Sequence, residues 1–153
     1  TITPQFAKRV LLAISRSDVT TLSRLFLNAQ SGLPFERSAH IRQPPGGPTP
    51  WIVQIPRIGL SHWAVDGDAK RTVDSGKTWH WTGTGLVGQG SNIVLFGHRT
   101  EAGGPYRYQH LIQGGDELII YTSDQRRYRY RMVAEFLENA RSARAAVCRF
   151  LRK

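Results

Sequence analysis

The fold is decided by one short stretch, residues 92–100, which reads Asn92-Ile93-Val94-Leu95-Phe96-Gly97-His98-Arg99-Thr100. Its apolar run is bounded by polar residues and glycine, which is typical of a buried β-strand. Gly97 lets the backbone turn, and His98 then lies at the end of a rigid strand. A histidine whose backbone is fixed by a strand is well placed to transfer protons near neutral pH. Most histidines at strand ends are nevertheless surface residues.

Other short runs have the same character, being rich in Val, Ile and aromatic residues and bounded by Gly, Pro, Asp or Ser. They are Trp51–Ile55, His62–Val65, Glu117–Tyr121 and Arg127–Val133. Between them, residues 68–76 and 105–112 could each form one short helix. This leaves too little helix for repeated crossovers between parallel strands, so the sequence predicts a mainly β protein, a barrel or a sandwich.

The chain divides into four parts by composition. Residues 1–42 are predicted to be helical, because apolar residues such as Val10, Leu11 and Ile14 recur at helical spacing with a break at Ser17-Asp18. Residues 43–50 form a linker rich in Pro and Gly, residues 51–133 the β domain, and residues 134–153 a tail rich in Ala and Arg whose composition favours helix. The apolar run Val10–Ile14 is far shorter than the ~20 residues of a membrane-spanning helix, so no such segment is predicted in this chain.

Charge and cysteine usage limit the classes of partner and chemistry. The chain has 153 residues with 21 Lys and Arg against 11 acidic residues, and the net charge of +10 favours anionic surroundings. Nucleic acid, anionic lipid and anionic cell-wall polymers all meet that preference. The one cysteine, Cys148, excludes an intramolecular disulfide framework and a zinc site of several thiolates. It remains either a structural thiol or a nucleophile.

Several motifs occur in an order that resembles the bacterial sortase family, and most closely the class E enzymes of actinobacteria. They are Ile55-Pro56 with Ile58 and Leu60, Trp79-His80-Trp81 with Gly83-Thr84, Gly90-Ser91-Asn92, Gly97-His98-Arg99-Thr100, Gly104-Pro105-Tyr106, Leu111 and Gly115-Asp116-Glu117. A series of motifs in order is far more specific than any one of them.

The resemblance implies a β-barrel that carries a cysteine transpeptidase of the bacterial cell envelope, outside the cytoplasm and associated with the membrane. Such an enzyme cleaves a sorting signal near the C-terminus of a secreted protein and joins it to an amine of a cell-wall precursor or a pilin. It implies His98 as the general acid and Cys148 as the nucleophile that forms a thioacyl-enzyme, with no cofactor and no metal. Nucleic acid is then not an expected partner, whereas an anionic envelope surface is.

The C-terminal part departs from the family pattern. There the cysteine ends a strand reading roughly Thr-Leu-Thr-Cys, and a further strand supplies an arginine, whereas Cys148 follows Ala145-Ala146-Val147 and only five residues come after it. The sequence therefore predicts a barrel that lacks its last strand. Neither Arg149 nor Arg152 is assigned as the family's arginine, and Arg99 is expected to support its loop because strand neighbours face opposite sides.

Two other interpretations stay open at this stage. One is a catalytically impaired sortase-like domain that binds extended peptides. The other is a basic nucleic-acid-binding domain, which rests on charge alone because the aromatic and basic motifs of RNA-binding sheets are not seen.

Overall fold

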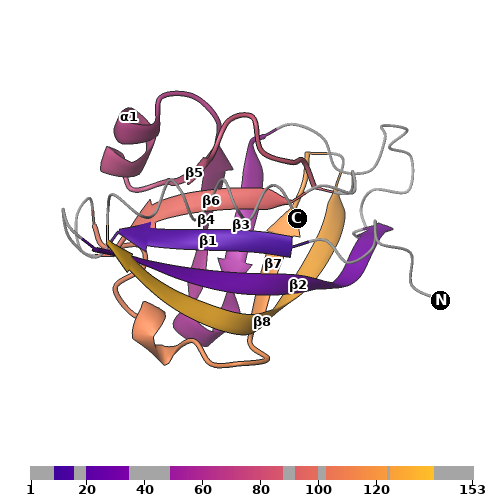
Figure 1. The fold of residues 1–153 in the computed structure, drawn as a ribbon. Helices are drawn as coiled ribbons and strands as arrows, with labels where there is room; N and C mark the ends of the chain where they lie inside the picture. The colour runs from indigo at the N-terminus through magenta and orange to yellow at the C-terminus, as the bar shows by residue number, and fades with distance from the viewer. Residues whose placement is uncertain are drawn as a thin grey trace.

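The computed structural model describes residues 9–15, 20–34, 49–87, 92–99, 103–123 and 125–139. Within these residues, eight strands form one closed barrel (Figure 1). The strands are β1 (Arg9–Ser15), β2 (Thr20–Pro34), β3 (Trp51–Ile55), β4 (Leu60–Val65), β5 (Thr78–His80), β6 (Ile93–His98), β7 (Glu117–Tyr121) and β8 (Arg126–Asn139). The helices are the 3-10 turn η3 (Pro56–Ile58), the α-helix α1 (Ala69–Asp74) and the 3-10 turn η4 (Gln109–Leu111).

The order around the barrel is β1-β2-β8-β7-β3-β4-β5-β6, and β6 pairs with β1 to close it. Most neighbouring pairs are antiparallel, whereas β1 with β6 and β4 with β5 are parallel. Because β1 and β6 run the same way, their C-terminal ends lie at the same end of the barrel, where α1 also lies (Figure 1). The strand end that carries His98 therefore has a strand on each side and a helix beside it.

The core fills the inside of the barrel with alternate residues of each strand. In β3, Trp51, Val53 and Ile55 are buried while the residues between them are half-buried. In β8, Tyr128, Tyr130 and Met132 point inward in the same way. Residues 127–133 thus have one apolar and one more exposed face, and Arg129 on the outer face pairs with Glu117.

The helices predicted within residues 1–42 are wrong for the residues that the structure describes. Residues 9–15 and 20–34 are the antiparallel strands β1 and β2 of the barrel. A short apolar run such as Val10–Ile14 fits a buried strand as well as a buried helix. Here β1 pairs with β6 and β2 pairs with β8, and these tertiary contacts favour the strand. In β2 the buried positions are Leu22, Arg24 and Phe26, a spacing of two that belongs to a strand.

The described barrel is closed, with β1 and β2 between β6 and β8. The strand that the family has after its cysteine would fall beyond Cys148, outside the described residues, so its absence stays a prediction. In addition, β8 runs to Asn139, so the first residues of the tail predicted to begin at 134 are strand and not helix. Pairing with the long β2 overrides their helix propensity. Residues 140–153, and most of the linker predicted for 43–50, lie outside the described residues.

Most of the remaining elements agree with the sequence, although the strand β5 was not predicted from it. The bounds of β3 and β7 are the predicted ones, and β4, β6 and β8 differ at their ends. The helix predicted within residues 68–76 is α1, which begins after Asp68, whose side chain accepts a hydrogen bond from the Arg71 backbone N–H at 2.8 Å. Within residues 105–112 the helix is only the 3-10 turn η4.

Candidate active site

His98 is the last residue of β6, and its side chain lies on the outer face of the barrel. Leu95 and Gly97 are buried toward the core, so the alternating geometry of a strand places Phe96 and His98 on the other side. The rings of Phe96 and His98 meet edge to face with their centroids 6.5 Å apart. The His98 side chain keeps 13% of its surface exposed, so it is held by its surroundings and still reaches solvent.

A carboxylate lies against this histidine. Asp74 ends α1, and its Oδ1 is 3.1 Å from His98 Nε2. Its other oxygen accepts a hydrogen bond from Lys70 Nζ at 2.6 Å, one helical turn earlier. Hydrogen bonds from Lys70 and then from His98 hold the pKa of Asp74 below its ordinary value. Asp74 is therefore ionised at neutral pH and can accept a hydrogen bond from the imidazole ring.

The role of Asp74 is not visible in the sequence. The residue lies 24 positions before His98 in the chain, and no motif connects the two. The one available signal was the capped helix at residues 68–76, which fixes where Asp74 falls but not what it faces.

The neighbouring strand brings a second residue to this edge of the barrel. In the parallel pairing of β1 with β6, Ser15 is the Cα partner of His98. Cys148, Arg149 and Arg152 lie outside the described residues, so the pairing of Cys148 with His98 remains a prediction. Arg99 has a buried Nε with no hydrogen-bond partner among the described residues, and its expected role in the loop also remains a prediction.

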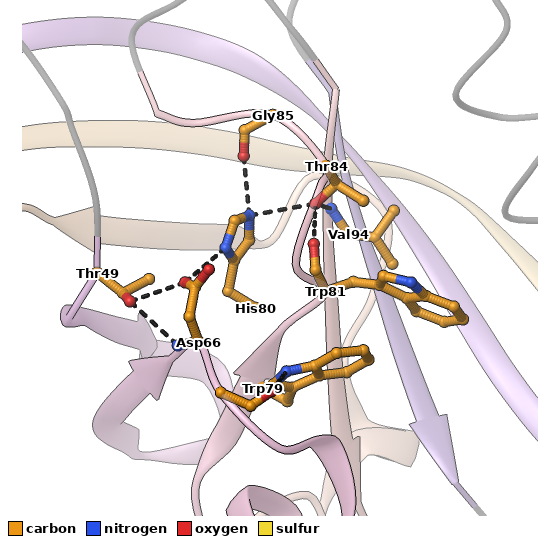
Figure 2. A network of polar contacts seen from close by, with 9 residues as sticks. Thr49, Asp66, Trp79, His80, Trp81, Thr84, Gly85 and Val94 are labelled. Atoms are coloured by element: carbon orange, nitrogen blue, oxygen red, sulfur yellow. Dashed lines mark hydrogen bonds and ion pairs between the residues drawn. The ribbon is translucent and has the colours of Figure 1, made fainter.

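A second histidine, His80, is at the centre of a polar network between the loops of the barrel (Figure 2). Its side chain is 1% exposed and packs against Trp51, with ring centroids 4.7 Å apart. Nδ1 lies 2.8 Å from Asp66 Oδ1, and Nε2 lies 2.9 Å from the Gly85 carbonyl and 3.1 Å from Thr84 Oγ1. The Thr49 hydroxyl also donates to Asp66 Oδ1 at 2.8 Å.

The order Asp66, His80, Thr84 has the connectivity of a nucleophilic triad, but the hydroxyl is already engaged. Thr84 Oγ1 donates to the Trp81 carbonyl at 2.7 Å and accepts from the Val94 N–H at 3.2 Å. It has no proton left for the histidine to withdraw. The network therefore joins β5, β6 and the loops at residues 49, 66 and 84–85, and we interpret it as structural (Figure 2).

Arg24 is a second residue whose role the sequence does not indicate. It is 2% exposed, and burial lowers its pKa while Glu135 and Asp116 oppose that shift. Its guanidinium donates to the Ile112 carbonyl and to Gln109 Oε1, both at 3.0 Å, and pairs with Glu135 at 2.9 Å. Arg24 thereby fastens η4 to β2 and β8.

The described residues contain no group of three or more His, Cys, Asp or Glu side chains arranged to hold a metal ion. No helix among them is long and apolar enough to cross a membrane. Trp79 and Trp81 pack against each other, with ring centroids 5.2 Å apart and ring planes tilted by 34°, and Trp79 Nε1 donates to the Gly67 carbonyl at 2.9 Å.

The fold and the site together define a closed β-barrel protein with a histidine–aspartate pair at the end of one barrel strand. The chain matches the sequence model of the sortase domain over residues 53–148, which is more than half of its length. It therefore belongs to the sortase family, as the order of its motifs indicated. The matched region contains His98 and ends at the single cysteine.

Individual relatives are sortases as well. Sortase SrtE1 of Streptomyces coelicolor is 28% identical to the chain over 80 residues, which cover 48% of this chain and 23% of that protein. The chain thus spans less than a quarter of the length of this curated relative.

Among solved structures, the chain is similar to sortase E1 from Streptomyces coelicolor, crystallised with a tripeptide in its active site. The identity is 16% and the TM-score 0.46, over 61% of this chain and 92% of that one. It is also similar to the SrtA sortase from Actinomyces oris, with 16% identity and a TM-score of 0.43 over 67% and 88% of the two chains.

Proposed function

We propose that this protein is a sortase-type cysteine transpeptidase that uses His98 as general acid and Cys148 as nucleophile. The observation that carries the proposal is the His98–Asp74 pair at the end of β6, inside the region that matches the sortase domain. The match also ends on the only residue of the chain able to supply a thiolate. The substrate class is the sorting signal of a secreted protein, and the acceptor is an amine of a cell-wall precursor or a pilin.

The chemistry follows from these groups in two acyl transfers. The Cys148 thiolate attacks the scissile carbonyl, the carbon–nitrogen bond breaks, and the His98 imidazolium gives its proton to the departing amine. The acceptor amine then attacks the thioacyl carbon, loses a proton to the now neutral His98, and releases the thiolate. The enzyme returns to its starting state with no net change in protons.

Asp74 supports the first step because its carboxylate lies against the ring that must carry the proton. Asp74 Oδ1 lies 3.1 Å from Nε2 and can hold the ring in one orientation through this contact. The side chain is partly exposed, so solvent weakens this interaction without abolishing it.

The surroundings of the enzyme are proposed from its charge and family. A net charge of +10 favours the anionic surface of a bacterial envelope, where sortases act. An extracytoplasmic position would also bring the protein to secreted substrates and cell-wall amines.

The test is cleavage of a fluorogenic Leu-Pro-x-Thr-Gly or Leu-Ala-x-Thr-Gly peptide, with and without an added amine, by the full chain. We expect thiol-dependent cleavage that is lost in Cys148→Ala and in His98→Ala. His110→Ala is the matched control, since this exposed histidine on η4 should be dispensable. If Cys148→Ala and His98→Ala cleave as fast as the parent protein, the catalytic assignment is wrong.

A second measurement separates the enzyme from an impaired peptide-binding domain. A sorting-signal peptide that ends in a vinyl sulfone should label Cys148 if its thiolate is reactive. Binding of the unmodified peptide without turnover and without labelling would instead support a domain that only binds peptides.

A further inference from the structure

The residue before His98 is pressed against an aromatic ring. A Cβ atom added to Gly97 would lie 2.3 Å from Cε2 and 2.7 Å from Cδ2 of Tyr106, much closer than an ordinary contact. Glycine is therefore required at position 97 because the ring occupies the space of a side chain. The inner face of the strand end rests on Tyr106.

The same tyrosine also holds the backbone of His98 itself. The Tyr106 N–H donates to the His98 carbonyl at 3.1 Å, so the backbone of Tyr106 lies against the strand end. Tyr106 is completely buried. It thus contacts two successive residues, Gly97 by its ring and His98 by its backbone.

The ring of Tyr106 is fixed in turn by a chain of short hydrogen bonds. Its hydroxyl lies 2.6 Å from Thr78 Oγ1, and Thr78 Oγ1 lies 2.6 Å from His62 Nε2. Burial lowers the pKa of His62, which keeps the ring neutral, and a hydrogen bond to the backbone of Gly76 uses its remaining proton. The Nε2 lone pair then accepts from Thr78, and Thr78 accepts from Tyr106.

This direction of hydrogen bonding, from Tyr106 to Thr78 to His62, is consistent with the environment of each group. Burial raises the pKa of the Tyr106 phenol, so it remains a donor at physiological pH. Thr78 donates once and accepts once, and the Tyr106 hydroxyl donates once, so both hydroxyl protons have an acceptor. Thr78 lies on β5 and His62 on β4, so the ring is anchored to two barrel strands.

We propose that Tyr106 is a positioning residue for His98, holding the strand end from inside the barrel through Gly97, the His98 carbonyl and Thr78. The inference rests on the proposed function for its catalytic meaning, but its structural part can be measured separately. It gives the Gly104-Pro105-Tyr106 segment a role, since a tyrosine and not a phenylalanine is needed to reach Thr78. Asp74 orients the ring of His98, and Tyr106 fixes the backbone from which that ring projects.

The experiment compares Tyr106→Phe, Thr78→Val and Thr78→Ser in the full chain. Tyr106→Phe keeps the ring and removes the hydroxyl, Thr78→Val removes its acceptor, and Thr78→Ser keeps a hydroxyl there. We expect kcat for peptide cleavage to fall about 5- to 10-fold in the first two with KM little changed, and to stay near the parent value in Thr78→Ser. Tyr108→Phe, at a tyrosine 52% exposed, is the control.

The second readout does not depend on activity. Nitrogen-15 NMR of the imidazole follows the His98 ring signals, which should shift or broaden in Tyr106→Phe and Thr78→Val but not in Thr78→Ser or Tyr108→Phe. A loss of thermal stability in Tyr106→Phe and Thr78→Val with unchanged His98 signals would overturn the proposal and leave Tyr106 a core residue only. If the parent cleaves no peptide while the His98 signals respond as expected, the proposed function fails and the positioning role stands.

Discussion

Replacing Gly97 by alanine tests the contact that holds the end of β6. The added Cβ would lie 2.3 Å from Cε2 of Tyr106, so the ring and the strand must separate by about 1 Å to reach ordinary contact. The ring cannot retreat freely, because its hydroxyl is bonded to Thr78 at 2.6 Å. Either that bond breaks or the strand end moves.

The expected cost combines two effects. Overpacking a core by one methyl group costs about 1–3 kcal/mol, and the loss of one buried hydrogen bond adds about 1 kcal/mol. Gly97→Ala should therefore lower the free energy of unfolding by about 2–4 kcal/mol. For a chain of this size the thermal midpoint should fall by roughly 5–15 °C.

The assay is urea unfolding of the parent, Gly97→Ala, Tyr106→Ala and the double variant. Tyr106→Ala alone should cost about 3–5 kcal/mol, but in that background Gly97→Ala meets an open space and should cost close to nothing. Gly114→Ala is the matched control, since nothing lies within 4 Å of its added Cβ. A cost for Gly97→Ala below about 0.5 kcal/mol, or the same cost in both backgrounds, would refute the contact.

Three further changes test other parts of the structure. Leu12→Ala should cost about 2–5 kcal/mol in urea unfolding, because Leu12 is completely buried in β1; a cost within about 0.5 kcal/mol would mean that β1 is not a barrel strand. Arg24→Met should cost about 1–3 kcal/mol in the same assay, since it leaves Gln109 Oε1 and the Ile112 carbonyl without their donor, and a neutral or stabilising change would contradict the described contacts. Burial lowers the folded-state pKa of His62 below the ordinary 6.5, so the unfolded chain takes up the proton first and stability should fall as the pH drops below about 6.5. His62→Gln should flatten the dependence of the urea midpoint on pH between 7 and 5, and an unchanged slope would show that His62 does not cause it.

Except for the three-residue strand β5, the strands between residues 51 and 121 were predictable because local signals agreed there. Trp51–Ile55 and Glu117–Tyr121 combine β-branched or aromatic residues with a clear boundary, Pro56 after the first and a Gly-Gly-Asp turn before the second. His98 was found for the same reason, since an apolar strand, a glycine and a histidine follow one another directly.

The N-terminal strands were not predictable because their partners are distant in the sequence. Val10–Ile14 is apolar at every position, so its pattern fits a helix and a strand equally, and its pairing with β6 settles the matter. Arg24 suggested a solvated face, whereas the barrel buries it among acceptors from η4. Asp74 was missed for a similar reason, because only the packing of α1 beside β6 shows what it faces.

The place of β1 between β2 and β6 also sets the order in which the protein can be assembled. The hairpin of β1 and β2 is made on the ribosome before the strands that cover its two outer edges, which begin only at Ile93 and Arg126. At roughly 5–20 residues per second, about 100 residues of further synthesis leave these edges unpaired for roughly 5–20 s. Unpaired strand edges recruit other chains, so this hairpin is where we expect aggregation of the nascent protein to begin.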